Sequence, residues 1–393
     1  MTALTTLSTP VQTARSRADR IISLDVMRGL VMVLMAVDHV RVYSGVPAGS
    51  PIPGIFFTRW ITHFCAPAFV FFAGTGAFLH GRKLGEKRAL ARYLVTRGVI
   101  LVVLELTVIR FAWTFNFDYA HWVLAGVIWM LGWCMIMLAA LVWLPTWAIG
   151  TLGLLTIVFQ QVFSLVPRVL PESLRNSVGW IWEFVYPSGL DGPQAINILY
   201  VLVPWIGVMA IGYAFGAIMI CESAQRRRLC LKIGLSATAL FLVAGVVSVL
   251  LRPAPANAMP ALFRLLNQVK YPPSLLFLLM TLGPTIALLP LAERERGWFA
   301  GILTTFGRVP LFYYLLHIPV IHIVALLVWY LRVGSAHSEY FRSAPHVSVP
   351  PEQRWGLPLL YLVFVIVVTL LYFPCRWFAS VKARRQKGWL SYL

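Results

Sequence analysis

The segment LMAVDHVRVYSG, residues 34–45, places an acid, an imidazole and a guanidinium close together at the end of an apolar run. These three groups belong to Asp38, His39 and Arg41. A histidine side chain accepts a proton near neutral pH, so His39 is a candidate general base and Asp38 a candidate to support it. Arg41 has a second interpretation, because a long basic side chain at the end of a membrane span commonly reaches toward the interface.

A helix over residues 22–44 arranges the polar residues of this region by face. At 3.6 residues per turn, Arg28 and His39 lie nearly on one face and about 16 Å apart along the axis. Asp25 and Arg28 are spaced i, i+3 and are expected to pair, either for function or as a topology-setting ion pair. Asp38 points to a different face. The predicted stripe is Asp25, Arg28, Met32, Met35 and His39.

Other apolar segments also contain ionisable groups, which are costly in a bilayer and therefore point to function. Arg59 and His63 are i, i+4 neighbours, and His63 is either a second catalytic histidine or a satisfied core residue. His317 lies near the middle of the segment 309–331 and is expected to face a cavity. Glu105 is expected to be paired or protonated, and we favour a structural role for it.

The composition is that of an integral membrane protein. Of the 393 residues 59% are hydrophobic and 12% are charged, whereas soluble domains carry about 25% charged residues. The net charge of +19 does not indicate nucleic-acid binding, because the chain has no separate basic domain and no nucleic-acid motif. The five cysteines show no disulfide framework and no metal-ligand spacing, so we expect neither a disulfide nor a metal site.

The sequence predicts an all-α, polytopic transmembrane helix bundle of about ten spans. With the N-terminus inside, 22 of the 33 Lys and Arg residues fall in cytoplasmic segments, so both termini are expected in the cytoplasm. The expected organisation is an N-terminal tail (1–20), one transmembrane domain (21–378) and a basic tail (379–393). The predicted spans lie near 22–44, 56–79, 93–114, 122–143, 146–166, 196–220, 232–251, 273–292, 309–331 and 356–378.

Six stretches, in order along nearly the whole chain, resemble bacterial relatives of the heparan-alpha-glucosaminide N-acetyltransferase catalytic domain family. They are RIISLDVMRGLVMVLMAVDHVR, FTRWITHFCAPAFVFFAG, PWIGVMAIGYAFG, KYPPSLLFLLMTLGP, GRVPLFYYLLHIPVIH and FPCRWFASVKARRQKGWLSYL. SLDVMRG followed by DH is also similar to the first helix of the wider integral-membrane acyltransferase superfamily, where a histidine at the outer end is regarded as catalytic. His39 matches that position, and YLLHIPV, which contains His317, resembles a later motif of the superfamily. The lysosomal enzyme of the family has a polar amide where His39 stands.

The resemblance implies transfer of an acyl group, expected to be acetyl, from cytoplasmic acyl-CoA to an amine or hydroxyl of an extracytoplasmic glycan or related envelope acceptor. The implied location is the bacterial cytoplasmic membrane, and a homodimer is compatible with the sequence. The expected catalytic residues are His39, His63, Asp38 and His317. The residues expected on the cofactor side, where acetyl-CoA phosphates bind cations, are Asp25, Arg28, Arg59, Arg82 and Lys83.

Two mechanisms and two other classes of function follow from these residues. A histidine either deprotonates the acceptor for direct attack on the thioester, which we favour, or itself becomes acetylated. The alternative class is a transporter or exporter of a small anion or lipid-linked sugar that uses the same polar stripe as its pathway. In a third interpretation, the protein is a scaffold subunit with structural histidines.

Overall fold

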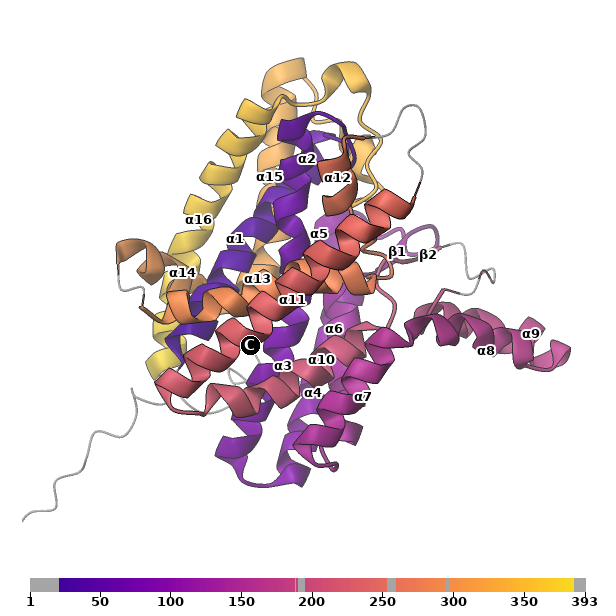
Figure 1. Ribbon diagram of the computed structural model, residues 1–393. Coiled ribbons are helices and arrows are strands. Elements are labelled where there is room, and N and C mark those ends of the chain that lie inside the picture. Colours follow the sequence, from indigo (N-terminus) through magenta and orange to yellow (C-terminus); the bar gives the residue numbers. More distant parts are fainter. Residues whose placement is uncertain (1–20, 188, 190–194, 253–258, 295–296, 385–393) are drawn as a thin grey trace, which may run out of the picture.

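The computed structural model describes residues 21–187, 189, 195–252, 259–294 and 297–384 (Figure 1). The predicted tail 1–20 lies outside the described residues. Residues 385–393 of the predicted basic tail 379–393 also lie outside them.

The described chain is almost entirely helical. Its α-helices are α1 (Ile22–Ser44), α2 (Pro53–Trp60), α3 (Cys65–Leu84), α4 (Lys87–Leu104), α5 (Arg110–Thr114), α6 (Val127–Leu141), α7 (Thr146–Val158), α8 (Val166–Val169), α9 (Glu172–Val178), α10 (Trp205–Met219), α11 (Ser223–Leu251), α12 (Ala261–Leu266), α13 (Leu275–Arg294), α14 (Trp298–Arg308), α15 (Pro310–Val333) and α16 (Leu357–Arg384). A π-helical turn, η2 (Glu105–Ile109), joins α4 to α5. The 3₁₀ segments are η1 (Ile61–Phe64), η3 (Gln160–Leu165), η4 (Gly179–Phe184), η5 (Ser338–Phe341) and η6 (Pro351–Gln353).

The length and apolar composition of its helices make this a multi-pass membrane protein. In the described residues, five helical stretches are long and apolar enough to span a bilayer: Pro53–Leu84, α11, α13, α15 and α16. A sixth is counted if Thr146–Val158 and Gln160–Val169, bent by 63° at their junction, form one span. The sequence count of ten also includes α1 and α4, which carry several charged residues, and α6 and α10, which have 15 residues each. The number ten stays a prediction.

Two predicted spans begin differently from expectation. Residues 122–143 and 196–220 were each expected to be helical throughout, but their first residues form strands β1 (Val123–Ala125) and β2 (Ile196–Ile198). The strands pair in parallel, with Leu124 opposite Asn197. Helices α6 and α10 then begin only after Gly126 and Pro204, which occupy their N-cap positions. Glycine and proline are poor inside helices, so each gives the chain a place to change conformation.

Helix α1 occupies the centre of the bundle, where it packs against α3, α13, α14, α15 and α16 (Figure 1). Its contact with α14 is backbone to backbone: a Cβ added at Gly307 would lie 1.8 Å from the carbonyl oxygen of Asp25. A Cβ added at Gly29 would meet the Leu303 carbonyl equally closely. This approach holds Arg308, the last residue of α14, beside the beginning of α1. Helices α8 and α9 extend sideways from the bundle (Figure 1).

Candidate functional site

Two histidines from distant parts of the chain meet beside α1. The Nδ1 atom of His39, on α1, lies 2.7 Å from the Nε2 atom of His317, on α15. The two rings stack with their centroids 4.9 Å apart, and Trp113 packs edge-on against His39. His317 is fully buried and His39 half-buried. Of the predicted catalytic residues, His39 and His317 are therefore brought into direct contact.

The hydrogen bonds define which ring nitrogens carry protons in the neutral pair. The Nδ1 atom of His317 lies 2.6 Å from the backbone carbonyl oxygen of Tyr314, which only accepts, so His317 donates from Nδ1. In neutral His317, Nε2 is then an acceptor, and His39 must donate to it from Nδ1. Among the described residues no group hydrogen-bonds to His39 Nε2, so its lone pair can accept a proton. The contact with His317 orients the His39 ring.

Asp38 binds two arginines. Its Oδ1 accepts from Arg41 Nε and its Oδ2 from Arg59 Nη1, both at 2.9 Å. Arg41 also donates to the carbonyl of Val46 and is only 8% exposed. The interpretation of Arg41 as an interfacial side chain was wrong, because these partners hold its guanidinium within the protein and it does not reach toward the interface. Arg59, expected on the cofactor side, lies instead in this cluster.

A small cavity of about 40 Å³ opens beside the histidine pair. Asp38, His39, Thr62, Tyr200 and Lys270 supply its polar lining. Its remaining lining residues are Met35, Cys65, Ala66, Phe69 and Val127. A space of this size accommodates a group of a few atoms, such as an acetyl group.

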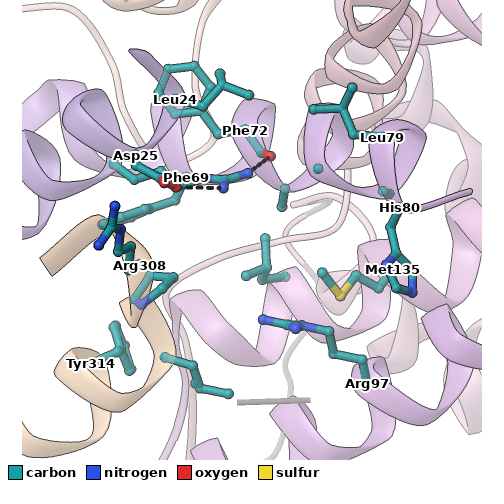
Figure 2. A pocket seen from close by; sticks show the side chains of 18 of the residues that line it. Leu24, Asp25, Phe69, Phe72, Leu79, His80, Arg97, Met135, Arg308 and Tyr314 are labelled. Carbon is teal, nitrogen blue, oxygen red and sulfur yellow. Dashed lines mark hydrogen bonds and ion pairs between the residues drawn. The ribbon is translucent and has the colours of Figure 1, made fainter. Parts of the chain in front are cut away.

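A much larger cavity, of about 900 Å³, lies at the other end of α1 (Figure 2). Figure 2 shows Asp25, Arg97 and Arg308 on three different helices around this space. Its volume is at the upper end of the range for small-molecule sites. The basic side chains along its lining are Arg28, Arg82, Lys83, Arg97, Arg308 and Lys382. Such a concentration of ammonium and guanidinium groups suits a ligand with several phosphates.

The predicted stripe on α1 connects the two cavities. Asp25, Arg28 and Met32 line the large cavity, whereas Met35 and His39 line the small one. Phe69 and Val127 line both, so a wall of two apolar side chains is shared between them. The predicted Asp25–Arg28 pair is present, with 4.0 Å between Oδ1 and Nη1, and Arg28 also donates to the carbonyl of Phe72. The stripe prediction is confirmed.

Two further predicted residues lie apart from the histidine pair. His63 is buried beside Phe277, lines neither cavity, and its Nδ1 has no hydrogen-bond partner among the described residues. Glu105 opens the π-helical turn, and its Oε2 accepts from the backbone N–H of Ile128 in the first turn of α6. A carboxylate at a helix N-terminus stabilises the helix, which agrees with the structural role favoured for Glu105.

Several lining residues were not recognised in the sequence. Lys270, between α12 and α13, and Tyr200, just before α10, reach the small cavity from loops. Arg97, Arg308 and Lys382 reach the large one from three helices. In the sequence, the lysines and arginines among these residues look the same as those that set membrane topology, because cytoplasmic segments are also rich in Lys and Arg. Only the packing of the helices separates the cations that line a cavity from those that face the water or headgroups.

A family model described as "Heparan-alpha-glucosaminide N-acetyltransferase, catalytic" matches residues 20–251. This range contains α1, the Asp38 cluster and most of the helices around the large cavity. Lys270 and His317 lie beyond it. No curated protein matches the chain. Because the match covers more than half of the chain, this protein belongs to the heparan-alpha-glucosaminide N-acetyltransferase catalytic domain family of membrane N-acetyltransferases.

Proposed function

We propose that this protein transfers an acetyl group from acetyl-CoA to an amine or hydroxyl of an extracytoplasmic glycan or related envelope acceptor. The enzyme would act in the bacterial cytoplasmic membrane, with the large cavity open to the cytoplasm. One observation supports the proposal: a basic cavity of about 900 Å³ and the small cavity lined by His39 share the side chains of Phe69 and Val127, and both border a single face of α1.

The charges of the large cavity support acetyl-CoA as the donor. Its diphosphate and 3′-phosphate need several cations, and Arg28, Arg82 and Lys83 meet Arg97, Arg308 and Lys382 there. Asp25 holds Arg28 in place rather than contacting the phosphates. The pantetheine arm is long and weakly polar, so its chemistry suits the apolar side chains of Phe69 and Val127 that separate the large cavity from the small one.

The hydrogen bonds of the histidine pair support direct transfer. His39 Nε2 removes the proton from the acceptor amine or hydroxyl as its nitrogen or oxygen attacks the thioester carbon. The carbonyl π electrons move to oxygen and give a tetrahedral intermediate. Its collapse breaks the carbon–sulfur bond, and the proton on His39 passes to the sulfur of CoA. His317 accepts the hydrogen bond from His39 Nδ1 throughout and so favours the imidazolium that forms in between.

Labelled acetyl-CoA added to inside-out vesicles tests the proposal. The expected result is label in an envelope glycan or lipid-linked sugar fraction and release of free CoA. The transporter alternative predicts flux of an anion or lipid-linked sugar without a CoA-dependent covalent product. Absence of label in every fraction, together with absence of acetyl-CoA binding, would contradict the proposed function. Acetyl-histidine trapped on the protein by rapid quenching would replace direct attack by a two-step transfer.

The variant His39→Ala tests the assigned base. Loss of general base catalysis lowers a rate typically by 10²- to 10⁴-fold. We expect such a fall in label transfer with expression and acetyl-CoA binding retained, because His39 does not line the large cavity. His121→Ala is the matched control, since His121 is exposed on a loop. Unchanged transfer by the His39 variant would remove His39 from the mechanism.

A further inference from the structure

Lys270 is a buried cation that has no carboxylate partner among the described residues. It lies in the short segment between α12 and α13 and is 8% exposed. In the part of the chain that the structure describes, its ammonium forms no ion pair with an acid. The Lys270 Nζ lies over the ring of Tyr271, 5.1 Å from its centroid. Burying an ammonium is costly, so a residue placed in this way needs an explanation.

The small cavity carries an excess of positive charge. Asp38 is the acid at this site, and both of its oxygens are already bound by Arg41 and Arg59. Lys270 therefore adds a third positive charge to a site where Asp38 already binds two arginines. Burial raises the pKa of the neighbouring Tyr271 hydroxyl, but the positive charges of Lys270 and Arg59, together with a hydrogen bond with Tyr200, bring that pKa below its usual value.

Lys270 lines the same small cavity as His39. At about 40 Å³ the cavity has room for roughly three water-sized groups. That is the size of an acetyl group, and the apolar Met35, Ala66 and Phe69 provide a surface for its methyl carbon. In this position the carbonyl oxygen meets the polar side of the cavity. There a negative charge on that oxygen is favoured by the Lys270 ammonium.

We infer that the small cavity receives the acetyl group and that Lys270 is a catalytic residue that stabilises the oxyanion of the tetrahedral intermediate. This inference rests on the proposed acetyl transfer. As the acceptor attacks and His39 takes its proton, the carbonyl oxygen gains the electron pair and binds the Lys270 ammonium, which keeps all its protons. When the carbon–sulfur bond breaks, the pair returns to re-form the carbonyl. His39 then protonates the departing sulfur.

Arg41 and Arg59 are poorer candidates for this role. Both guanidinium groups are held by Asp38, and Arg41 is further tied to the carbonyl of Val46 and Arg59 to Thr62. Neither arginine lines the small cavity, whereas Lys270 does. The flexible stem of a lysine also lets its ammonium follow an oxygen that moves as the carbon becomes tetrahedral.

The variant Lys270→Met tests this role, because methionine keeps the apolar stem and removes the charge. Lys232→Met is the matched control, since Lys232 is an exposed lysine on α11 that lines neither cavity. Purified variants in detergent are assayed with labelled acetyl-CoA and the acceptor fraction that wild-type protein labels. Acetyl-CoA binding and the thermal midpoint are measured alongside, to show that each variant is folded.

Removal of one oxyanion donor costs about 10²- to 10³-fold in kcat. We expect a fall of that size for Lys270→Met, with KM and Kd for acetyl-CoA within about threefold of wild type. A kcat within threefold of wild type would overturn the inference, as would an unchanged kcat with a raised KM for the acceptor, which would make Lys270 an anchor for an anionic acceptor. If wild-type protein itself transfers no label, the proposed function fails first, so the two failures are distinguishable.

Discussion

The hydrogen bond that His317 donates to the Tyr314 carbonyl oxygen is a small feature with a large consequence for His39. Because the Tyr314 carbonyl oxygen can only accept, it sets the tautomer of His317, and His317 in turn sets that of His39. A histidine that orients another through its ring nitrogen acts as a positioning residue. Its substitution should therefore impair the base without removing it.

Replacement of His317 separates this positioning role from bulk packing. His317→Gln keeps an oxygen that can accept from His39 Nδ1, whereas His317→Leu offers no acceptor. We expect kcat to decrease in the order wild type, Gln variant, Leu variant, with KM for acetyl-CoA unchanged. The measurement is steady-state kinetics as a function of pH. The Leu variant should also show a shift in one limb of its profile of kcat against pH. Equal kcat for the Gln and Leu variants would contradict the positioning role.

At the scale of elements, the two arginines Arg97 and Arg92 of α4 differ in position: only one of them lines the large cavity. Arg97 lines the cavity, whereas Arg92, five residues earlier on the same helix, is exposed and lines neither cavity. Arg97→Gln removes a charge facing the proposed phosphates, so it should raise the KM for acetyl-CoA about tenfold and leave kcat nearly unchanged. Arg92→Gln is the matched control. A similar KM for both variants would show that Arg97 does not bind the donor.

The contact between α1 and α14 depends on glycine. A Cβ at Gly307 would lie 1.8 Å from the Asp25 carbonyl oxygen, so Gly307→Ala must push the two helices apart. We expect a lower thermal midpoint and weaker acetyl-CoA binding, because Arg308 and Arg28 would both be displaced. Gly301→Ala, on the same helix, is the control, since a Cβ there meets no atom within 4 Å. Thermal unfolding in detergent compares them, and equal midpoints would refute the close packing.

At the scale of the whole molecule, the two cavities give the reaction a direction. The basic cavity, lined by Arg28, lies at the beginning of α1 and the small cavity, lined by His39, toward its end; these two residues are about 16 Å apart along the axis. Acetyl-CoA does not cross bilayers, so transfer should occur when it is added to inside-out vesicles and not when it is added to intact right-side-out vesicles. Permeabilising the latter should restore transfer. Equal rates in both intact preparations would contradict a one-sided donor site.

Much of the site could be expected from the sequence, because helical periodicity is a local property. The positions of Asp25, Arg28 and His39 on one face of α1 follow from 3.6 residues per turn, and the cavities border that face. The apolar composition determined a helical membrane protein, and the motifs of α1 and α15 resemble those of the acyltransferases. The strands before α6 and α10 were missed, because three-residue strands carry little periodic signal.

The tertiary structure alone decided which polar groups work together. His39 and His317 are 278 positions apart, and Lys270 comes from a loop at the start of the stretch KYPPSLLFLLMTLGP, whose resemblance to the family gave this lysine no role. The same applies to Arg41, which local sequence placed at the interface and which Asp38 and the Val46 carbonyl hold inside. The sequence determined the faces of individual helices, since these depend on neighbours along the chain. The partners across the cavities depend on how the helices pack, and close backbone contacts such as that between Gly307 and α1 fix that packing.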